Sequence, residues 1–160
     1  MPTALLITDS FEGTRAVRDI LTDTGYVVIP AGNSEEAFDH CKHSKIDAVI
    51  LDILFATAAL GTDVLHRIRE SCPGIPVLFL SGTRLERWTV ADFSNLQKLL
   101  PGRVEVLLKP FTAAELRAAM ASLLSESYSD ETIRQVVASA AMMRQRIAEE
   151  AFRHLRLLDG

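Results

Sequence analysis

Five short apolar runs alternate with segments of helical period, and this alternation constrains the fold more than any other feature of the sequence. The apolar runs are Ala4–Thr8, Tyr26–Pro30, Ala48–Leu51, Pro76–Leu80 and Val104–Leu108. The segments of helical period are Thr14–Thr24, Asn33–His43, Asp63–Ser71, Val90–Leu100 and Thr112–Ser125. Such a β-α repeat predicts an α/β fold in which helices cover both faces of a parallel sheet.

Right-handed crossovers leave few topologies for five such units. We expect a flavodoxin-like, doubly wound sheet of five parallel strands in the order 2-1-3-4-5. Local signals support the helix ends, because Gly25 stands where the first helix needs a left-handed cap. Asn33 precedes Glu36 by three residues, which is the spacing of a capping box. Thr112 and Glu115 repeat that spacing before the last helix of the repeat.

Four of the apolar runs lead into a polar side chain with useful chemistry. These side chains are Asp9, Asp52, Ser81 and Lys109, in chain order. Ligands of open parallel sheets bind just outside the carboxyl ends of the strands. The two acids, the hydroxyl and the amine therefore predict a single site. A cis peptide bond between Lys109 and Pro110 would turn the amine inward.

These four chemical types suit an aspartate that accepts a phosphoryl group. A divalent cation neutralises phosphate oxygens and is itself held by carboxylates. A cationic side chain binds another phosphate oxygen, and a hydroxyl binds a third. Asp9, Asp52, Ser81 and Lys109 supply these chemical types.

On these residues the chain resembles the CheY-like receiver domain of bacterial two-component response regulators, between about Ala4 and Leu124. The matching features are Asp9, Arg15, the strand-end Asp52, Gly61 before residues 64–69, Ser81 after residues 76–80, and the run from Lys109 through Pro110 to Phe111. The resemblance implies a regulatory phosphoacceptor protein that is not an enzyme. Its partner would be a sensor histidine kinase or a phosphotransfer protein, and its cofactor Mg²⁺.

The resemblance also implies a role for each site residue. Asp52 would accept the phosphoryl group and help to hold the metal. Asp9 would be a second metal ligand, and Leu54 would be a third through its backbone carbonyl. Ser81 would sense the phosphate through its hydroxyl, and Lys109 would bind it through its amine. Slow, Mg²⁺-dependent dephosphorylation would reset the protein.

Several departures from the family pattern leave an alternative open. Ser10 stands where the family usually has a second acid, so a weak metal site is expected, with Ser10 as a further candidate ligand. The same serine could cap the first helix. Val106 replaces the switch aromatic of the fifth strand, and residues 82–102, which include Trp88, form a longer segment than usual. The alternative is a pseudo-receiver that binds partner proteins without being phosphorylated.

Two other functions, a phosphatase and a flavin-binding protein, fit the sequence less well. Haloacid-dehalogenase phosphatases also use a strand-end aspartate, but they need a second aspartate two residues later as general acid. Leu54 occupies that position. Flavin binding of the flavodoxin type needs a phosphate loop rich in Ser, Thr and Gly after the first strand, whereas residues 9–14 here are acidic.

A polar break at Ser127–Asp130 divides the chain into a receiver at residues 1–126 and an extension at 127–160. The extension predicts one amphipathic helix, Ile133–Leu158, because its apolar residues recur every three or four positions. No turn divides this segment, which argues against a helix-turn-helix output. A stripe of this length must be buried. We expect a homodimer through the stripe, with folding back onto the receiver as the alternative.

Charge and composition limit the other partners. The formal net charge of −4 gives no indication of a nucleic-acid surface. No apolar run approaches the length of a membrane span, so no membrane partner is expected. Cys41 and Cys72 have no paired spacing and read as reduced, small hydrophobic residues. A cytoplasmic location is the expectation that follows.

Overall fold

The computed structural model describes residues 1–52, 67–82 and 103–125 and, near the C-terminus, residues 142, 145–146, 149–150 and 152–156. The strands of this part of the chain are β1 (Thr3–Ile7), β2 (Val27–Ala31), β3 (Ala48–Asp52), β4 (Val77–Ser81) and β5 (Val104–Leu108). All neighbouring strands are parallel, and their order is β2-β1-β3-β4-β5. The predicted fold class and strand order are therefore confirmed. The bounds of β1, β2, β3 and β4 differ from the predicted runs by one residue, and those of β5 agree.

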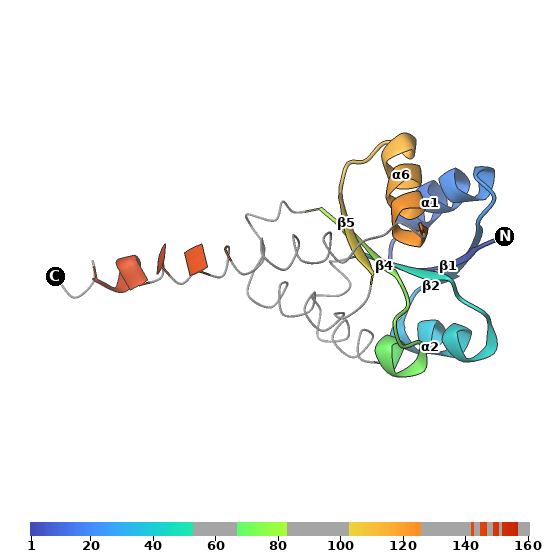
Figure 1. Cartoon of the computed structure of the whole chain (residues 1–160), viewed down its shortest axis with the longest axis horizontal. Coiled ribbons are helices and arrows are strands. Elements are labelled where there is room, and N and C mark those ends of the chain that lie inside the picture. Colours follow the sequence, from blue (N-terminus) through green and yellow to red (C-terminus); the bar gives the residue numbers. More distant parts are fainter. Residues whose placement is uncertain are drawn as a thin grey trace.

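Helices cover both faces of the sheet (Figure 1). Helices α1 (Phe11–Asp23) and α6 (Ala113–Leu124) pack on one face. Helix α2 (Ser34–His43) and the helical residues 67–71 lie on the other face. The predicted helix Val90–Leu100 and the first four residues of the predicted helix Asp63–Ser71 lie outside the described residues.

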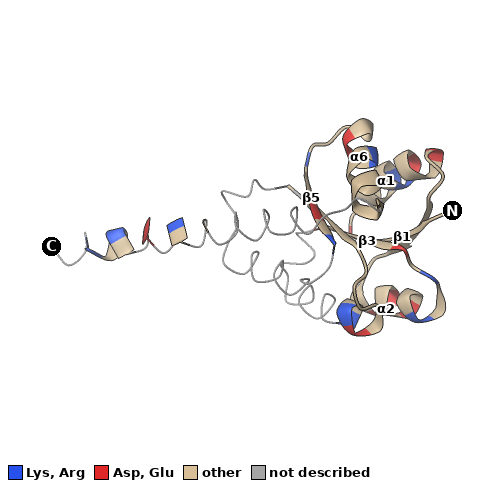
Figure 2. Ribbon diagram, in the orientation of Figure 1, with Lys and Arg blue, Asp and Glu red and all other residues tan. Residues whose placement is uncertain are grey.

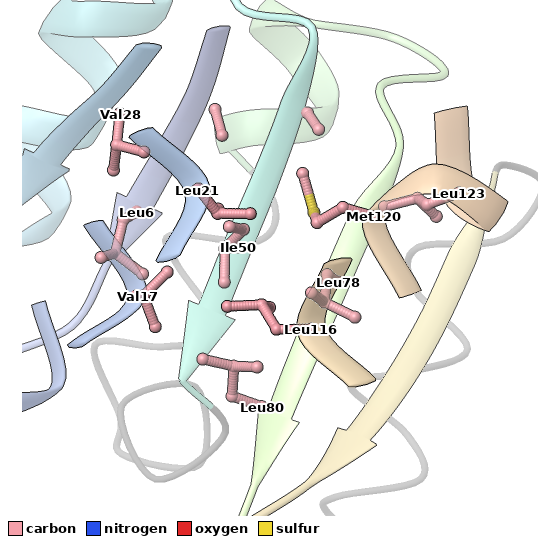
Figure 3. Packing of buried hydrophobic residues seen from close by; sticks show 12 residues of the cluster. Leu6, Val17, Leu21, Val28, Ile50, Leu78, Leu80, Leu116, Met120 and Leu123 are labelled. Carbon is pink, nitrogen blue, oxygen red and sulfur yellow. The ribbon is translucent and has the colours of Figure 1, made fainter. Parts of the chain in front are cut away.

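The two faces of the sheet have separate cores, because side chains alternate along each strand. Leu6, Ile50 and Leu78 pack with α1 and α6, as Figure 3 shows. Leu5 and Phe79 point to the opposite face and pack with residues of α2 and the 67–71 segment. A strand buried on both faces needs apolar residues at every position. This requirement explains why β1 and β3 were visible as continuous apolar runs.

Helix α1 is fixed at both ends by its own sequence. Ser10 is the N-cap, since its side-chain oxygen accepts a hydrogen bond from the Gly13 N–H at 3.1 Å. The helix therefore begins at Phe11, three residues earlier than predicted. At the other end the Gly25 N–H donates to the Thr22 carbonyl, and Tyr26 donates to an earlier carbonyl of the last turn. This is a Schellman motif, and Gly25 has the positive φ of 93° that it requires.

The two predicted capping boxes differ in the structure. Thr112 and Glu115 form a complete capping box at the start of α6. Asn33 caps α2 by accepting from the Glu36 N–H at 2.9 Å. The Glu36 carboxylate, however, accepts from the Gly32 N–H, one residue before the position expected for a capping box. The cap is therefore present, but the reciprocal bond is displaced by one residue.

The described residues near the C-terminus are helical, so an additional C-terminal helix is present. All of them are exposed, and the exposed fractions are 70% for Met142, 60% for Phe152 and 61% for Leu155. They lie at the opposite end of the molecule from the N-terminus (Figure 1). Within the described parts of the chain, no helix is long and apolar enough to span a bilayer. Acidic and basic residues are interspersed over the described helices (Figure 2).

Replacement of Gly25 by alanine should lower the free energy of unfolding by about 1 kcal/mol, because a Cβ is unfavourable at positive φ. No neighbouring atom lies within 4 Å of the added Cβ, so the cost is conformational and not a clash. Gly32→Ala is the matched control, since Gly32 is an exposed loop glycine without a positive φ. Urea denaturation of both variants checks this. Equal stability of Gly25→Ala and Gly32→Ala would contradict the assignment of the Schellman cap.

Candidate functional site

The polar residues predicted for the site lie at the carboxyl edge of the sheet. Asp52 is the last residue of β3, and Ser81 is the last residue of β4. Lys109 directly follows β5. The pairing of β5 with β4 places Leu108, the residue before Lys109, beside Ser81. Asp9 follows β1, whose last residue is paired with Leu51. The strand order therefore places the four residues on adjacent strand ends.

An ion pair joins two of these residues across the sheet. The Lys109 amine donates to the Asp52 carboxylate, with a distance of 2.7 Å between Nζ and Oδ2. The Asp52 side chain is 10% exposed and that of Lys109 is 35% exposed. Partial burial strengthens the Coulomb attraction between the two charges, because the effective dielectric constant is lower than in bulk water. Both groups also lose hydration, which offsets part of that attraction.

The ion pair borders a cavity of about 330 Å³ between α1 and the end of the sheet. Asp52 and Lys109 contribute its charged groups, and Thr8 contributes a hydroxyl. Most of the remaining lining is apolar and includes Ile20 and Phe111. An apolar wall beside a carboxylate lowers the local dielectric constant and strengthens electrostatic interactions at that carboxylate. The Lys109–Pro110 peptide bond, which also borders the cavity, is cis, as the sequence had allowed.

The loop after β1 places an acid and a helix cap beside this cavity. Asp9 is exposed and lies directly before the cap residue Ser10. The Ser10 N–H donates to the Thr8 hydroxyl at 3.2 Å, and the Ser10 carbonyl accepts from the Thr14 hydroxyl at 2.8 Å. The expectation that Ser10 caps the first helix is confirmed. Its hydroxyl, which accepts from Gly13, is therefore engaged by the backbone of α1.

Comparison with known proteins decides the family. The chain matches the family model of the response regulator receiver domain over residues 4–121. The chain belongs to this family. Its relatives are bacterial proteins of two-component signalling, in which receiver domains act as regulatory phosphoacceptors. Receiver domains interact with sensor histidine kinases and generally bind Mg²⁺ at the phosphorylation site.

Two relatives show how far the similarity extends. The chain is 31% identical over 132 residues to the response regulator MprA of Mycobacterium sp. (strain KMS), and the alignment covers 82% of this chain and 54% of MprA. It is 29% identical over 126 residues to the autoinducer 1 sensor kinase/phosphatase LuxN of Vibrio campbellii, covering 79% of this chain and 14% of LuxN. The receiver chain therefore spans about half or less of these relatives.

Solved structures of receiver domains share the fold. The chemotaxis protein CheY4 of Vibrio cholerae superposes with a TM-score of 0.66 at 21% identity, covering 78% of this chain and 99% of CheY4. A response regulator receiver protein from Sinorhizobium medicae superposes with a TM-score of 0.63 at 29% identity, covering 80% of this chain and 97% of that protein.

The receiver site can be compared with each predicted residue. The structure brings Asp52 and Lys109 into contact and places Asp9 on the neighbouring strand end. Ser81 ends β4 at the same edge, and its side chain lies outside the described part of the structure. Leu54, together with its backbone carbonyl, also lies outside the described residues.

Thr8 is a site residue that the sequence analysis missed. It is buried, its N–H donates to the Ala31 carbonyl, and its hydroxyl accepts from Ser10. Thr8 therefore fixes the start of the loop that carries Asp9. The sequence did contain a signal, because Thr8 puts a hydroxyl at the end of an otherwise apolar run. A hydroxyl buried with such a run needs a hydrogen-bond partner nearby.

The chemistry of the residues present fits a magnesium ion. Carboxylate oxygens are the ligands that Mg²⁺ prefers, and Asp9 and Asp52 follow neighbouring strands. In the described part of the chain no group of three or more His, Cys, Asp or Glu side chains is arranged to hold a metal. Ser10 adds a neutral oxygen, which attracts a cation less than a carboxylate does. Two carboxylates and several water molecules would suit the hydrated coordination of Mg²⁺.

Proposed function

We propose that Asp52 accepts a phosphoryl group from a sensor histidine kinase or a phosphotransfer protein, and that the chain acts as a regulatory protein without substrate turnover. The ion pair between Asp52 and Lys109 carries this proposal, because it places a cation at the acceptor carboxylate before phosphate arrives. Membership of the receiver family supports it. The cytoplasm, where such kinases present their phosphohistidine, is the proposed location.

The proposed reaction transfers one phosphoryl group between two side chains. A carboxylate oxygen of Asp52 attacks the phosphorus of a phosphohistidine in the partner, and the P–N bond breaks as the O–P bond forms. The released imidazole takes up a proton from solvent. Lys109 moves from the carboxylate to an oxygen of the phosphoryl group, where its charge stabilises the transition state. The Ser81 hydroxyl donates to another phosphoryl oxygen.

We further propose Asp9, Asp52 and the Leu54 carbonyl as ligands of Mg²⁺, with Ser10 as an additional neutral ligand. When bound, the cation supplies charge neutralisation at the phosphoryl oxygens. The Asp9 and Asp52 carboxylates attract it through their negative charge. Slow hydrolysis of the acyl phosphate by water would return Asp52 to its free form.

The wild-type chain incubated with acetyl phosphate and Mg²⁺ should gain the mass of one phosphoryl group. Asp52→Asn should gain none, because the amide is not a nucleophile. Lys109→Met should be phosphorylated at least about tenfold more slowly, since the transition-state charge loses its cation. Intact-mass spectrometry over time measures all three proteins, and circular dichroism controls for folding. A wild-type mass that stays unchanged at high Mg²⁺ concentration would contradict phosphorylation.

A phosphorylation-independent pseudo-receiver is the second candidate function. It is favoured by Ser10, which replaces one acid of the usual pair and is engaged in capping α1. The metal site then has fewer charges, and the charge count of the ligands tunes the affinity for a divalent cation. In this alternative the chain binds partner proteins through the receiver fold alone.

Ser10→Asp separates the metal effect from the capping effect. Aspartate is about as good an N-cap as serine, so α1 should keep its start. The added carboxylate should tighten Mg²⁺ binding by about tenfold or more in a calorimetric titration. Ser10→Asn is the matched control, because it keeps a capping side chain without adding charge. Equal Mg²⁺ affinity of Ser10→Asp and the wild type would show that this position does not face the metal.

We propose residues 1–126 as the receiver and residues 127–160 as a helical extension that makes a homodimer through Ile133–Leu158. The exposed apolar side chain of Leu155, which belongs to this stripe, supports burial against another surface. A second copy of the chain fits best, because a two-fold pairing of one stripe closes the assembly. Basic and acidic residues both occur among the described residues of the tail (Figure 2), as on the surface of coiled-coil helices.

Charge placed in the stripe should convert the dimer to a folded monomer. Met143 and Ile147 fall on the apolar stripe at helical period, and the neighbouring Met142 falls on the opposite side. Light scattering should give a monomer for Met143→Glu combined with Ile147→Glu, and a dimer for the control Met142→Glu. A wild-type protein that is monomeric at tens of micromolar would contradict dimerisation and favour folding back onto the receiver.

A further inference from the structure

Cys41 and Cys72 lie together in the fold although thirty residues separate them in the sequence. Cys41 belongs to α2, and Cys72 directly follows the helical residues 67–71. Both side chains are half-buried and pack against the same core cluster on this face of the sheet. The Cys41 thiol is within hydrogen-bonding reach of the Cys72 sulfur. The sequence analysis treated the two cysteines as unrelated because their spacing carries no motif.

Other contacts fix both thiols in place. The guanidinium of Arg67 lies 5.3 Å from the centre of the Phe38 ring, which joins the 67–71 segment to α2. The Cys72 N–H donates to the Ile68 carbonyl at 2.8 Å, and the Cys72 carbonyl accepts from the Ile75 N–H. That second bond closes a turn through Pro73 and Gly74, whose φ of 76° is the one a type II turn requires. Both cysteines therefore lie on anchored backbone.

We propose that Cys41 and Cys72 form a redox-sensitive pair that peroxide converts to an intramolecular disulfide, cross-linking α2 to the chain after residue 71. The loop so closed contains β3 and therefore Asp52. The proposal is independent of the proposed phosphorylation, because neither thiol belongs to the acceptor site. The chain has two cysteines in all, so no third thiol competes within one molecule.

The oxidation takes two steps at adjacent sulfurs. Burial raises the pKa of the Cys41 thiol to about 12, and the adjacent Cys72 sulfur adds to the rise, so Cys41 alone is a poor nucleophile at neutral pH. In the first step the thiolate of one cysteine attacks one oxygen of hydrogen peroxide, the O–O bond breaks and hydroxide leaves, which gives a sulfenic acid. The thiol of the other cysteine then attacks that sulfur, and its proton leaves with the departing hydroxyl as water.

The overall reaction oxidises two thiols to one disulfide and reduces one hydrogen peroxide to two waters. A reducing thiol pool would reverse the reaction by exchange. Such reversible pairs are the kind of disulfide that occurs in reducing compartments.

The full-length chain treated with hydrogen peroxide should lose both free thiols in an Ellman assay and remain one covalent chain on a non-reducing gel. Peptide mapping should find Cys41 joined to Cys72, and dithiothreitol should restore both thiols. The melting temperature of the oxidised form should exceed that of the reduced form by roughly 5 °C or more, because the cross-link restrains the unfolded chain. Asp52→Asn should form the same disulfide, which separates this proposal from phosphorylation.

Two variants test whether both thiols are needed. Cys41→Ser and Cys72→Ser should each form no intramolecular cross-link under peroxide, and dimedone should trap a sulfenic acid on the cysteine that remains. Three results would overturn the proposal: a disulfide between two chains, further oxidation of both sulfurs without a cross-link, or an unchanged thiol count under peroxide.

Discussion

The ion pair between the Asp52 carboxylate and the Lys109 amine connects two strand ends that are separated by β4. Adjacent strands lie about 4.8 Å apart, so a long side chain is needed to cross the intervening strand. Lysine has that length and brings a full positive charge to a carboxylate beside an apolar cavity. Because Asp52 is nearly buried, its carboxylate has lost most of its contact with water, and the Lys109 amine offsets part of that loss. The strand order, the loop after β5 and the packing of α1 all contribute to this arrangement.

In the loop after β1, residue 10 can either cap helix α1 or contribute a charge to a metal site. Ser10 caps α1, which holds that helix against the sheet beside the cavity. An acid at this position would add charge for a metal. Serine gives α1 a defined start and adds no charge beside Asp9 and Asp52, which follow neighbouring strands. We propose that this choice weakens the attraction of the site for Mg²⁺.

The sequence was sufficient for the features that depend on local chemistry or on general rules of parallel sheets. Continuous apolar runs revealed β1 and β3, and Gly25 revealed the end of α1. The rule that parallel strands present their carboxyl ends at one edge predicted that Asp52 and Lys109 would meet. Contacts between separate helices could not be predicted in this way. The pairing of Cys41 with Cys72 depends on how α2 packs against the 67–71 segment, and no local pattern encodes that distance. The roles of Ser81 and Leu54 stay predictions.

The most direct test of the account locates the phosphoryl group chemically. Borohydride reduces an aspartyl phosphate to the corresponding alcohol, whereas free carboxylates do not react. The wild-type chain should therefore be incubated with acetyl phosphate and Mg²⁺, treated with borohydride and mapped by tandem mass spectrometry. The account predicts reduction at Asp52 alone and none when Mg²⁺ is chelated. Reduction at Asp9 or at another acid, with Asp52 intact, would contradict it.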